Sequence, residues 1–274
     1  MNDNRCGIVN PRFSFRNNKV SISAMHTFYA VTLILLVTPV AFGFPLTTED
    51  TGTLVQGRSK IELNTERGED QMNGARERSV SNEMALIHGL QDNLSGFLNL
   101  PYRGVSVQEA DGSSKNSRGF GDARFGVKWR YFEQDGLSLG IKGGVTVPTG
   151  DSEKKLGNGQ STYGVNAIAS YETAPLALHL NFGYTWLPNT LNRREGVINI
   201  STAVVLKLSS SWKVMADIGV AGNTNSASNE MPAFVGAGLS YKLKQDLSLD
   251  LGIKYGITAA ETDNTGLFGL GWIY

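Results

Sequence analysis

Charged side chains that recur at every second position are the residues of this chain best placed to act on a solute. Between residues 122 and 132, Asp122, Arg124, Lys128 and Arg130 alternate with apolar and aromatic side chains. Alternate side chains of an extended strand point to opposite faces, so these four charges share one face. If that face lines a closed barrel, its charges can set ion selectivity or guide a solute, or they can pair with one another and fill a narrow interior.

The same alternation adds candidates on later segments. Inverting the segment 122–132 would place its cations in lipid, at about 2–4 kcal/mol for each cation near the bilayer midplane. The apolar face is therefore expected to point outward and the charged face inward. The further residues predicted to line the interior are Lys142, His179, Lys207, Lys213, Asp217, Lys242, Asp250 and Lys254.

Catalytic chemistry has little support in the sequence. Hydrolysis through an activated nucleophile needs a base within hydrogen-bond reach, and only His88 and His179 follow residue 43. An approximate hairpin pairing places Ile168 opposite His179 and leaves Ser170 out of reach, so a lipid hydrolase is a minor alternative. The only cysteine, Cys6, offers no disulfide and no thiolate metal site, and the sequence predicts neither a cofactor nor a metal.

Period-two alternation recurs along the whole chain beyond residue 43 and predicts an antiparallel β-structure. Short turns are expected at 91–93, 133–136, 173–175, 209–211 and 244–246, and long polar loops at 66–79, 104–120, 149–161, 187–196, 222–231 and 259–265. About twelve strands are expected, at 58–65, 80–90, 94–103, 122–132, 137–147, 162–171, 176–186, 198–208, 212–220, 233–241, 247–257 and 266–274.

Strand length and turn pattern favour a membrane barrel over a soluble sandwich. A tilted strand of about 9–11 residues crosses a bilayer, whereas strands of globular proteins average about 5–6 residues. Short turns on one side and long loops on the other are typical of outer-membrane barrels. Aromatic side chains near both strand ends fit the two interfaces of a bilayer: Trp129, Tyr131, Tyr171, Trp212 and Tyr241 at the short turns, and Tyr163, Tyr184 and Trp186 opposite.

The amino-terminal segment resembles a secretory signal peptide. Residues 27–42 carry no charge, follow Arg16 and Lys19, and precede small residues at Ala41 and Gly43. Sixteen residues are too few for a helix that spans a bilayer, which needs about 20. We therefore expect a signal peptide at 1–43, with Met25 as an alternative start, and a single barrel domain at 44–274.

The last strand carries a terminal aromatic pattern. Phe268, Leu270, Trp272 and Tyr274 share one face, and the chain ends on the aromatic residue. This pattern resembles the carboxy-terminal signal that the outer-membrane assembly machinery recognises. A buried terminal strand of a soluble sheet is the alternative.

Charge balance argues against a nucleic-acid partner. The whole chain has 25 basic and 25 acidic residues, and residues 1–43 contain four of the basic and one of the acidic residues. The remaining 21 basic and 24 acidic residues give a net charge of −3, without the excess of basic residues that nucleic-acid binding requires.

Several segments resemble a known family of outer-membrane barrels, the meta-pathway phenol-degradation proteins, also described as transporters. The matching segments are PLTTEDTGT at 45–53, GDARFGVKWR at 121–130, VPTG at 147–150, LGNG at 156–159 and NFGYTW at 181–186. The resemblance implies an outer-membrane location and the passage or binding of hydrophobic aromatic compounds. It supplies no catalytic motif.

The sequence thus predicts an all-β, antiparallel up-and-down transmembrane barrel in a bacterial outer membrane, in contact with the bilayer and lipopolysaccharide. The predicted function is a passive channel or binding conduit for small molecules; the alternative is a closed structural or adhesion barrel. Asp151, Glu153, Lys154 and Lys155 can bind divalent ions or lipopolysaccharide, or they can remain solvated in an outer loop. Glu49 and Asp50 belong to either a plug or a disordered lead-in. The inward glycines favour an open or partly open interior.

The signal peptide gives a direct prediction. The mature protein should begin at Phe44, because the signal peptidase requires small side chains at positions such as Ala41 and Gly43. Amino-terminal sequencing of the membrane-bound form tests this, and a sequence that begins upstream of Thr27 would contradict it.

Overall fold

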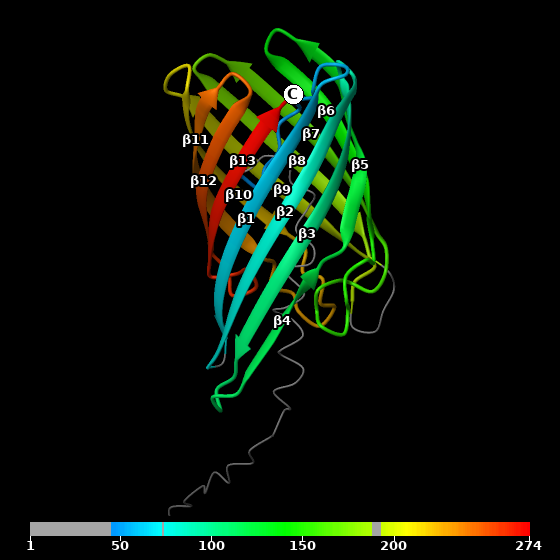
Figure 1. Ribbon diagram of the computed structural model, residues 1–274, viewed down its shortest axis with the longest axis vertical. Helices are drawn as coiled ribbons and strands as arrows, with labels where there is room; N and C mark the ends of the chain where they lie inside the picture. The colour runs from blue at the N-terminus through cyan, green and yellow to red at the C-terminus, as the bar shows by residue number, and fades with distance from the viewer. Residues whose placement is uncertain (1–44, 73, 188–192) are drawn as a thin grey trace, which may run out of the picture.

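The chain forms a closed antiparallel β-barrel, seen in the computed structural model, which describes residues 45–72, 74–187 and 193–274 (Figure 1). The predicted signal peptide lies outside the described residues. Among the described residues no helix is long and apolar enough to cross a membrane. The strands are β1 (Ser59–Met72), β2 (Ala75–Gln91), β3 (Leu94–Gln108), β4 (Ser114–Phe120), β5 (Ala123–Gln134), β6 (Leu137–Val147), β7 (Thr162–Thr173), β8 (Leu176–Trp186), β9 (Gly196–Lys207), β10 (Trp212–Ala221), β11 (Ala233–Lys244), β12 (Leu247–Gly256) and β13 (Asn264–Ile273).

The barrel closes where the first strand pairs with the last. β1 and β13 pair from Lys60 with Ile273 to Glu69 with Asn264. Beyond this ladder, Ser59 and Tyr274 exchange two backbone hydrogen bonds of 3.0 and 2.8 Å. Closure matters because lipid offers no partner to an unpaired strand edge.

Thirteen labelled strands make a twelve-stranded wall, because β4 and β5 follow one another along the same neighbour. β3 pairs with β5 over residues 94–99 and with β4 over residues 102–108. The pairing shifts by one residue at the break, where the Gly121 N–H donates to the Pro101 carbonyl over 2.8 Å. The predicted twelve-strand barrel is therefore confirmed.

Two of the predicted loops were wrong in part, because β-structure continues through them. Most of 66–79 belongs to β1 and β2, and 104–120 contains the end of β3 and all of β4. In 66–79 and in β4, polar side chains on both faces remove the apolar alternation that reveals a strand. At the end of β3, Val105 and Val107 do alternate with polar residues, and that stretch could have been recognised. The β1–β2 extension is reinforced across the hairpin by Arg76, 2.8 Å from Glu69.

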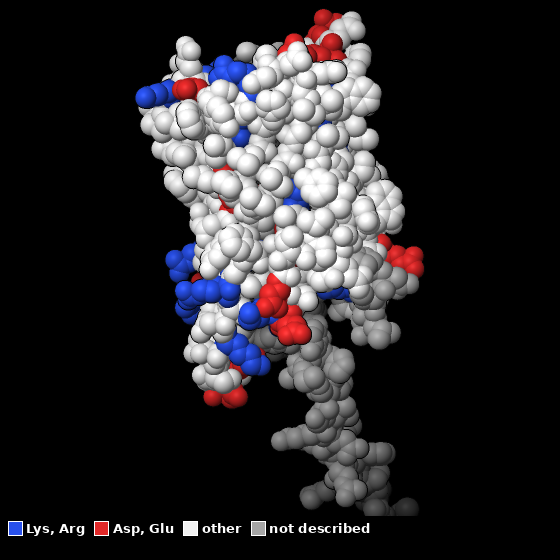
Figure 2. All heavy atoms as spheres, turned by 45° about the vertical axis from the view of Figure 1, so that its right-hand side comes forward, with Lys and Arg blue, Asp and Glu red and all other residues white. Residues whose placement is uncertain are grey.

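The apolar side chains point outward and the polar ones inward. Large outward residues such as Phe125, Leu180 and Ile200 are about half exposed, whereas Asn181 and Ser201 on neighbouring inward positions are buried. The visible outer surface has charges gathered toward its two ends and few between them (Figure 2). This distribution fits a wall whose middle faces hydrocarbon.

Aromatic residues form the two expected belts. At the short turns, the Trp212 and Tyr241 rings lie 4.4 Å apart, and Trp272 and Tyr274 lie 5.1 Å apart. Near the other end of the wall, Tyr184 lies 4.6 Å from Trp186. In Figure 1 the short turns occupy the upper end with the carboxy terminus, and the longer connections after β6, β10 and β12 occupy the lower end.

Variants that disturb the pairing of β1 with β13 should assemble poorly in the outer membrane. Deleting Tyr274, or replacing both Trp272 and Tyr274 by Ala, should lower the amount of heat-modifiable protein in the outer membrane. The deletion removes the two hydrogen bonds to Ser59, and an unpaired backbone group in lipid costs several kcal/mol.

The matched control replaces Trp212 and Tyr241 by Ala, because these residues form an aromatic pair at the same end on other strands. Equal losses in the two double variants would show that the last strand has no special role in insertion.

Candidate functional site in the barrel lumen

The segment before β1 lies inside the barrel. It ends at the short-turn end, where Gly57 donates its N–H to the Gly89 carbonyl over 2.9 Å. Earlier in the segment, the Leu54 N–H donates to Ser95 Oγ, the Thr51 N–H donates to Ser170 Oγ, and the Thr51 and Ser138 hydroxyls share a hydrogen bond. The luminal segment, residues 45–58, is therefore an internal plug, which the sequence had left open.

Side chains of the wall accept the backbone N–H groups of the luminal segment. Asp217 Oδ2 accepts from Thr47 and Thr48 over 2.8 and 3.1 Å. Asn181 Oδ1 accepts from the Glu49 N–H, and Asn181 Nδ2 donates back to the Glu49 carbonyl over 2.8 Å. These bonds are needed because buried backbone groups without partners are costly.

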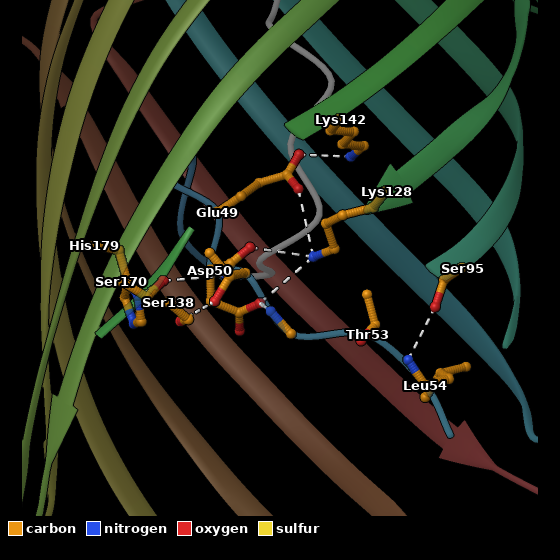
Figure 3. Close-up of polar contacts among 12 residues, drawn as sticks. Glu49, Asp50, Thr53, Leu54, Ser95, Lys128, Ser138, Lys142, Ser170 and His179 are labelled. Carbon is orange, nitrogen blue, oxygen red and sulfur yellow. Dashed lines mark hydrogen bonds and ion pairs between the residues drawn. The ribbon is translucent and has the colours of Figure 1, made fainter. Parts of the chain in front are cut away.

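Four charged residues join the luminal segment to β5 and β6 (Figure 3). Lys142 Nζ lies 2.5 Å from Glu49 Oε1, and both side chains are 1% exposed. Lys128 Nζ lies 3.7 Å from Glu49 Oε2 and 3.4 Å from Asp50 Oδ1. Lys128 and Lys142 are direct cross-strand partners, so the acidic pair compensates two neighbouring cations.

Glycines on the wall provide the space that the luminal segment occupies. A Cβ at Gly89 would lie 2.2 Å from the Val55 carbonyl oxygen, and one at Gly238 would lie 2.5 Å from Pro45. Gly252 also faces Pro45, at 2.9 Å. At these three positions the luminal segment, and not water or a solute, occupies the space that the missing side chains leave.

A second charged group lies on the strands nearer the long-loop end. Glu83 of β2 accepts from Asn99 of β3 over 2.5 Å and forms an ion pair with Arg124 of β5. Lys254 of β12 lies 3.0 Å from Glu261 and 5.3 Å from the centroid of the Phe234 ring. Arg124 and Lys254, both predicted to face inward, thus engage carboxylates.

A cavity of about 580 Å³ lies between the luminal segment and the wall. Its polar lining combines cations and carboxylates, and Lys207 and Lys213 face each other across β9 and β10. The predicted site residues that line it are Lys128, His179, Lys207, Lys213, Lys242 and Asp250.

Two predicted site residues form hydrogen bonds with turns and loops at the ends of the barrel. Asp122 accepts from the Gly150 and Asn158 N–H groups over 2.9 and 2.6 Å, which fastens the connection after β6. Arg130 lies 3.2 Å from Glu133 and donates to the Asp92 carbonyl in the β2–β3 turn. Asp217, as described above, holds the luminal segment.

The predicted partner of His179 was wrong by two residues. β7 and β8 place Ser170 opposite His179 and Ile168 opposite Asn181, because their turn has two residues, 174 and 175. His179 Nδ1 lies 2.8 Å from Ser170 Oγ. Ser170 is 1% exposed and its Oγ also accepts from the Thr51 N–H, so the pair fastens the luminal segment.

Several residues of this site were not among the predicted lumen-lining residues, although Ser170 was considered as a partner of His179. Inward positions of predicted strands are occupied by Glu83, Ser138, Ser170 and Asn181. A single polar residue on the inner face of a strand forms no pattern in the sequence that marks it as part of a site. Glu49 was noted without a partner. No group of residues suited to hold a metal ion occurs in the described part of the chain.

Comparison with known families and structures agrees with this architecture. A family model described as "Putative MetA-pathway of phenol degradation" matches residues 47–273. A search of curated protein sequences gave no match.

Among solved structures, the chain is similar to the COG4313 outer membrane channel from Pseudomonas putida F1. The TM-score is 0.72 at 13% identity, over 82% of this chain and 98% of that chain. The β domain of the Bordetella autotransporter BrkA gives 0.53 at 11% identity over 80% and 99%, and the NanC porin gives 0.51 at 11% over 78% and 98%. At these identities the likeness is one of fold, and it confirms the predicted outer-membrane barrel.

The close approach at Gly89 predicts how the luminal segment can be loosened. Gly89→Ala should displace residues 54–55 and cost about 1–3 kcal/mol, the usual penalty for overpacking. Hydrogen exchange at the Leu54 and Gln56 amides should become faster, because their acceptors Ser95 and Asp92 lie beside the displaced backbone.

Gly96→Ala is the matched control in the same hairpin, since a Cβ there would lie 3.6 Å from its nearest neighbour. Unchanged exchange in Gly89→Ala, or equal changes in both variants, would refute the predicted contact.

Proposed function

Since the chain belongs to the phenol-degradation family whose model matches residues 47–273, we propose that it is a passive outer-membrane channel for small molecules, hydrophobic aromatic compounds among them. The observation that carries the proposal is a closed barrel with a polar, charged interior and a cavity of about 580 Å³. Sites for small molecules usually measure about 300–1,000 Å³. The COG4313 relative, itself an outer membrane channel, supports the assignment through its shared fold.

The luminal segment sets the condition for conduction. It is bonded to β3, β6, β7, β8 and β10 and occupies the space over several inward glycines. The segment therefore narrows the lumen, and we infer that passage of an aromatic solute requires part of the segment to move. The same feature favours the second candidate function, a closed barrel that serves a structural or adhesive role.

The lysines of the cavity are the proposed selectivity residues at the short-turn mouth. Lys207 and Lys213 are direct cross-strand partners, and like charges in that position repel. An anion between them would relieve the repulsion. Lys242 lines the same cavity, and Arg130 lies on the rim at the β2–β3 turn.

The proposed surroundings follow from the outer surface. The apolar band contacts the bilayer, the long-loop end contacts lipopolysaccharide, and the strand with Phe268, Leu270, Trp272 and Tyr274 contacts the assembly machinery. Within the connection after β6, Lys154 lies 2.8 Å from Asp151, and this hydrogen bond holds the pKa of Asp151 below its usual range. These two charges balance each other, which favours a solvated loop over a dedicated ion site.

Single-channel recording tests the function and the selectivity together. The purified protein in a planar bilayer should give discrete current steps, and its reversal potential under a salt gradient should report a preference for anions. The double variant Lys207→Glu with Lys213→Glu should shift the reversal potential toward cation preference, because two cations at the mouth become two anions.

A protein that inserts fully and stays silent would support the closed barrel instead. Conduction with the same ion preference in both forms would show that these lysines do not set selectivity. Screening by salt, over about 8 Å at physiological ionic strength, would then explain why Lys207 and Lys213 can lie opposite each other without a bound anion.

A further inference from the structure

We propose that Lys128, Lys142 and Phe97 form a carboxylate-binding site that Glu49 fills in the closed barrel and that the carboxylate of an aromatic acid takes during passage. This inference rests on the proposed channel function and names a substrate class for it. The site would make the luminal segment a competitor of the solute.

The Glu49 carboxylate is held as a bound anion would be held. Its two oxygens face two lysines, Lys142 at 2.5 Å and Lys128 at 3.7 Å, and Glu49 itself is fully buried. Glu49 Oε2 has no hydrogen-bond donor among the described residues. The site therefore has unused capacity, which a differently oriented carboxylate can satisfy.

An aromatic surface adjoins the two lysines. Lys142 Nζ lies 4.7 Å from the centroid of the Phe97 ring, which is itself buried. Gly126 and Gly144 flank that ring, and a Cβ at either position would approach its Cζ atom to 2.8 or 3.1 Å. The ring therefore lies on these two glycines, and when the luminal segment withdraws, its other face offers a flat apolar surface beside the cations, which an aromatic ring prefers.

Charge makes the exchange selective. Withdrawal of Glu49 removes an anion from two lysines that face each other across β5 and β6. Water can then replace the hydrogen bonds between uncharged groups of the segment and the wall. It compensates poorly for the lost anion beside the two buried lysines. A solute that carries a carboxylate replaces Glu49 in kind, whereas a neutral aromatic compound leaves the cations without that anion.

The first test measures binding without transport. Benzoate titrated calorimetrically into the purified protein should bind the Glu49→Gln variant about tenfold more tightly than the wild type, or better, since a charge-assisted competitor has been removed. Benzyl alcohol, a neutral compound of similar size, should bind neither form measurably. Acetate should bind Glu49→Gln more weakly than benzoate does.

Two further variants keep the test decisive. Glu49→Gln with Lys142→Met removes both members of the buried pair without leaving a charge, and it should lose benzoate binding while it keeps the heat-modifiable fold. Asp151→Asn is the control for the loss of one negative charge, because Asp151 pairs with Lys154 in the exposed connection after β6, and it should bind benzoate as the wild type does.

The second test follows the luminal segment itself. Thr51 is 2% exposed, so in a Cys6→Ser background a Thr51→Cys thiol should react slowly with a water-soluble maleimide. Benzoate should accelerate the labelling in a saturable manner, and benzyl alcohol at the same concentration should not.

The outcomes separate this inference from the channel function. Equal benzoate affinity in wild type and Glu49→Gln, or equal binding of benzyl alcohol, would overturn the inference even in a conducting protein. Tight benzoate binding by Glu49→Gln in a protein that never conducts would support the site and refute the channel. An unchanged labelling rate at saturating benzoate would overturn the competition with Glu49.

Discussion

Hydrocarbon cannot hydrogen-bond to a polypeptide backbone, and the other features of this protein follow from that constraint. Every N–H and carbonyl group at membrane depth must pair within the protein, so the sheet closes through β1 and β13. Closure gives each strand one face toward lipid and one toward the lumen. Because the lipid face must be apolar, the polar and charged side chains of the alternating strands are directed inward.

That inward concentration of polar groups creates a second problem, which the luminal segment solves. Lys128 and Lys142 are buried, face each other across two strands and would repel without a neighbouring anion. Glu49 and Asp50 compensate them, and Asn181, Ser170 and Asp217 bind the extended backbone that carries these acids. Wall and segment therefore satisfy each other's hydrogen bonds and charges.

This arrangement connects stability with permeability. The contacts that hold the luminal segment to the wall also keep it in the path of a solute. Opening the lumen must break these contacts, and other groups must then pair with the side chains that are released. Water can substitute for the serine and asparagine contacts, since the lumen is polar. The buried ion pair with Lys142 is harder to replace, because a lone charge in a low-dielectric interior is costly. It therefore distinguishes charged solutes from neutral ones.

The sequence by itself determined the strands, their inward and outward faces and the closed barrel, because period-two alternation is a local property imposed on every strand by the bilayer. It missed the extensions of β1 and β2 and the whole of β4, where polar residues on both faces erase that signal. Tertiary structure alone decided the place of Glu49, which pairs with a residue 93 positions away, and the contact of Ser170 with His179. The place of Glu49 depends on hydrogen bonds and charges between residues far apart in the chain, which leave no periodic pattern in the sequence. The Ser170–His179 contact depends on a turn that is one residue shorter than expected.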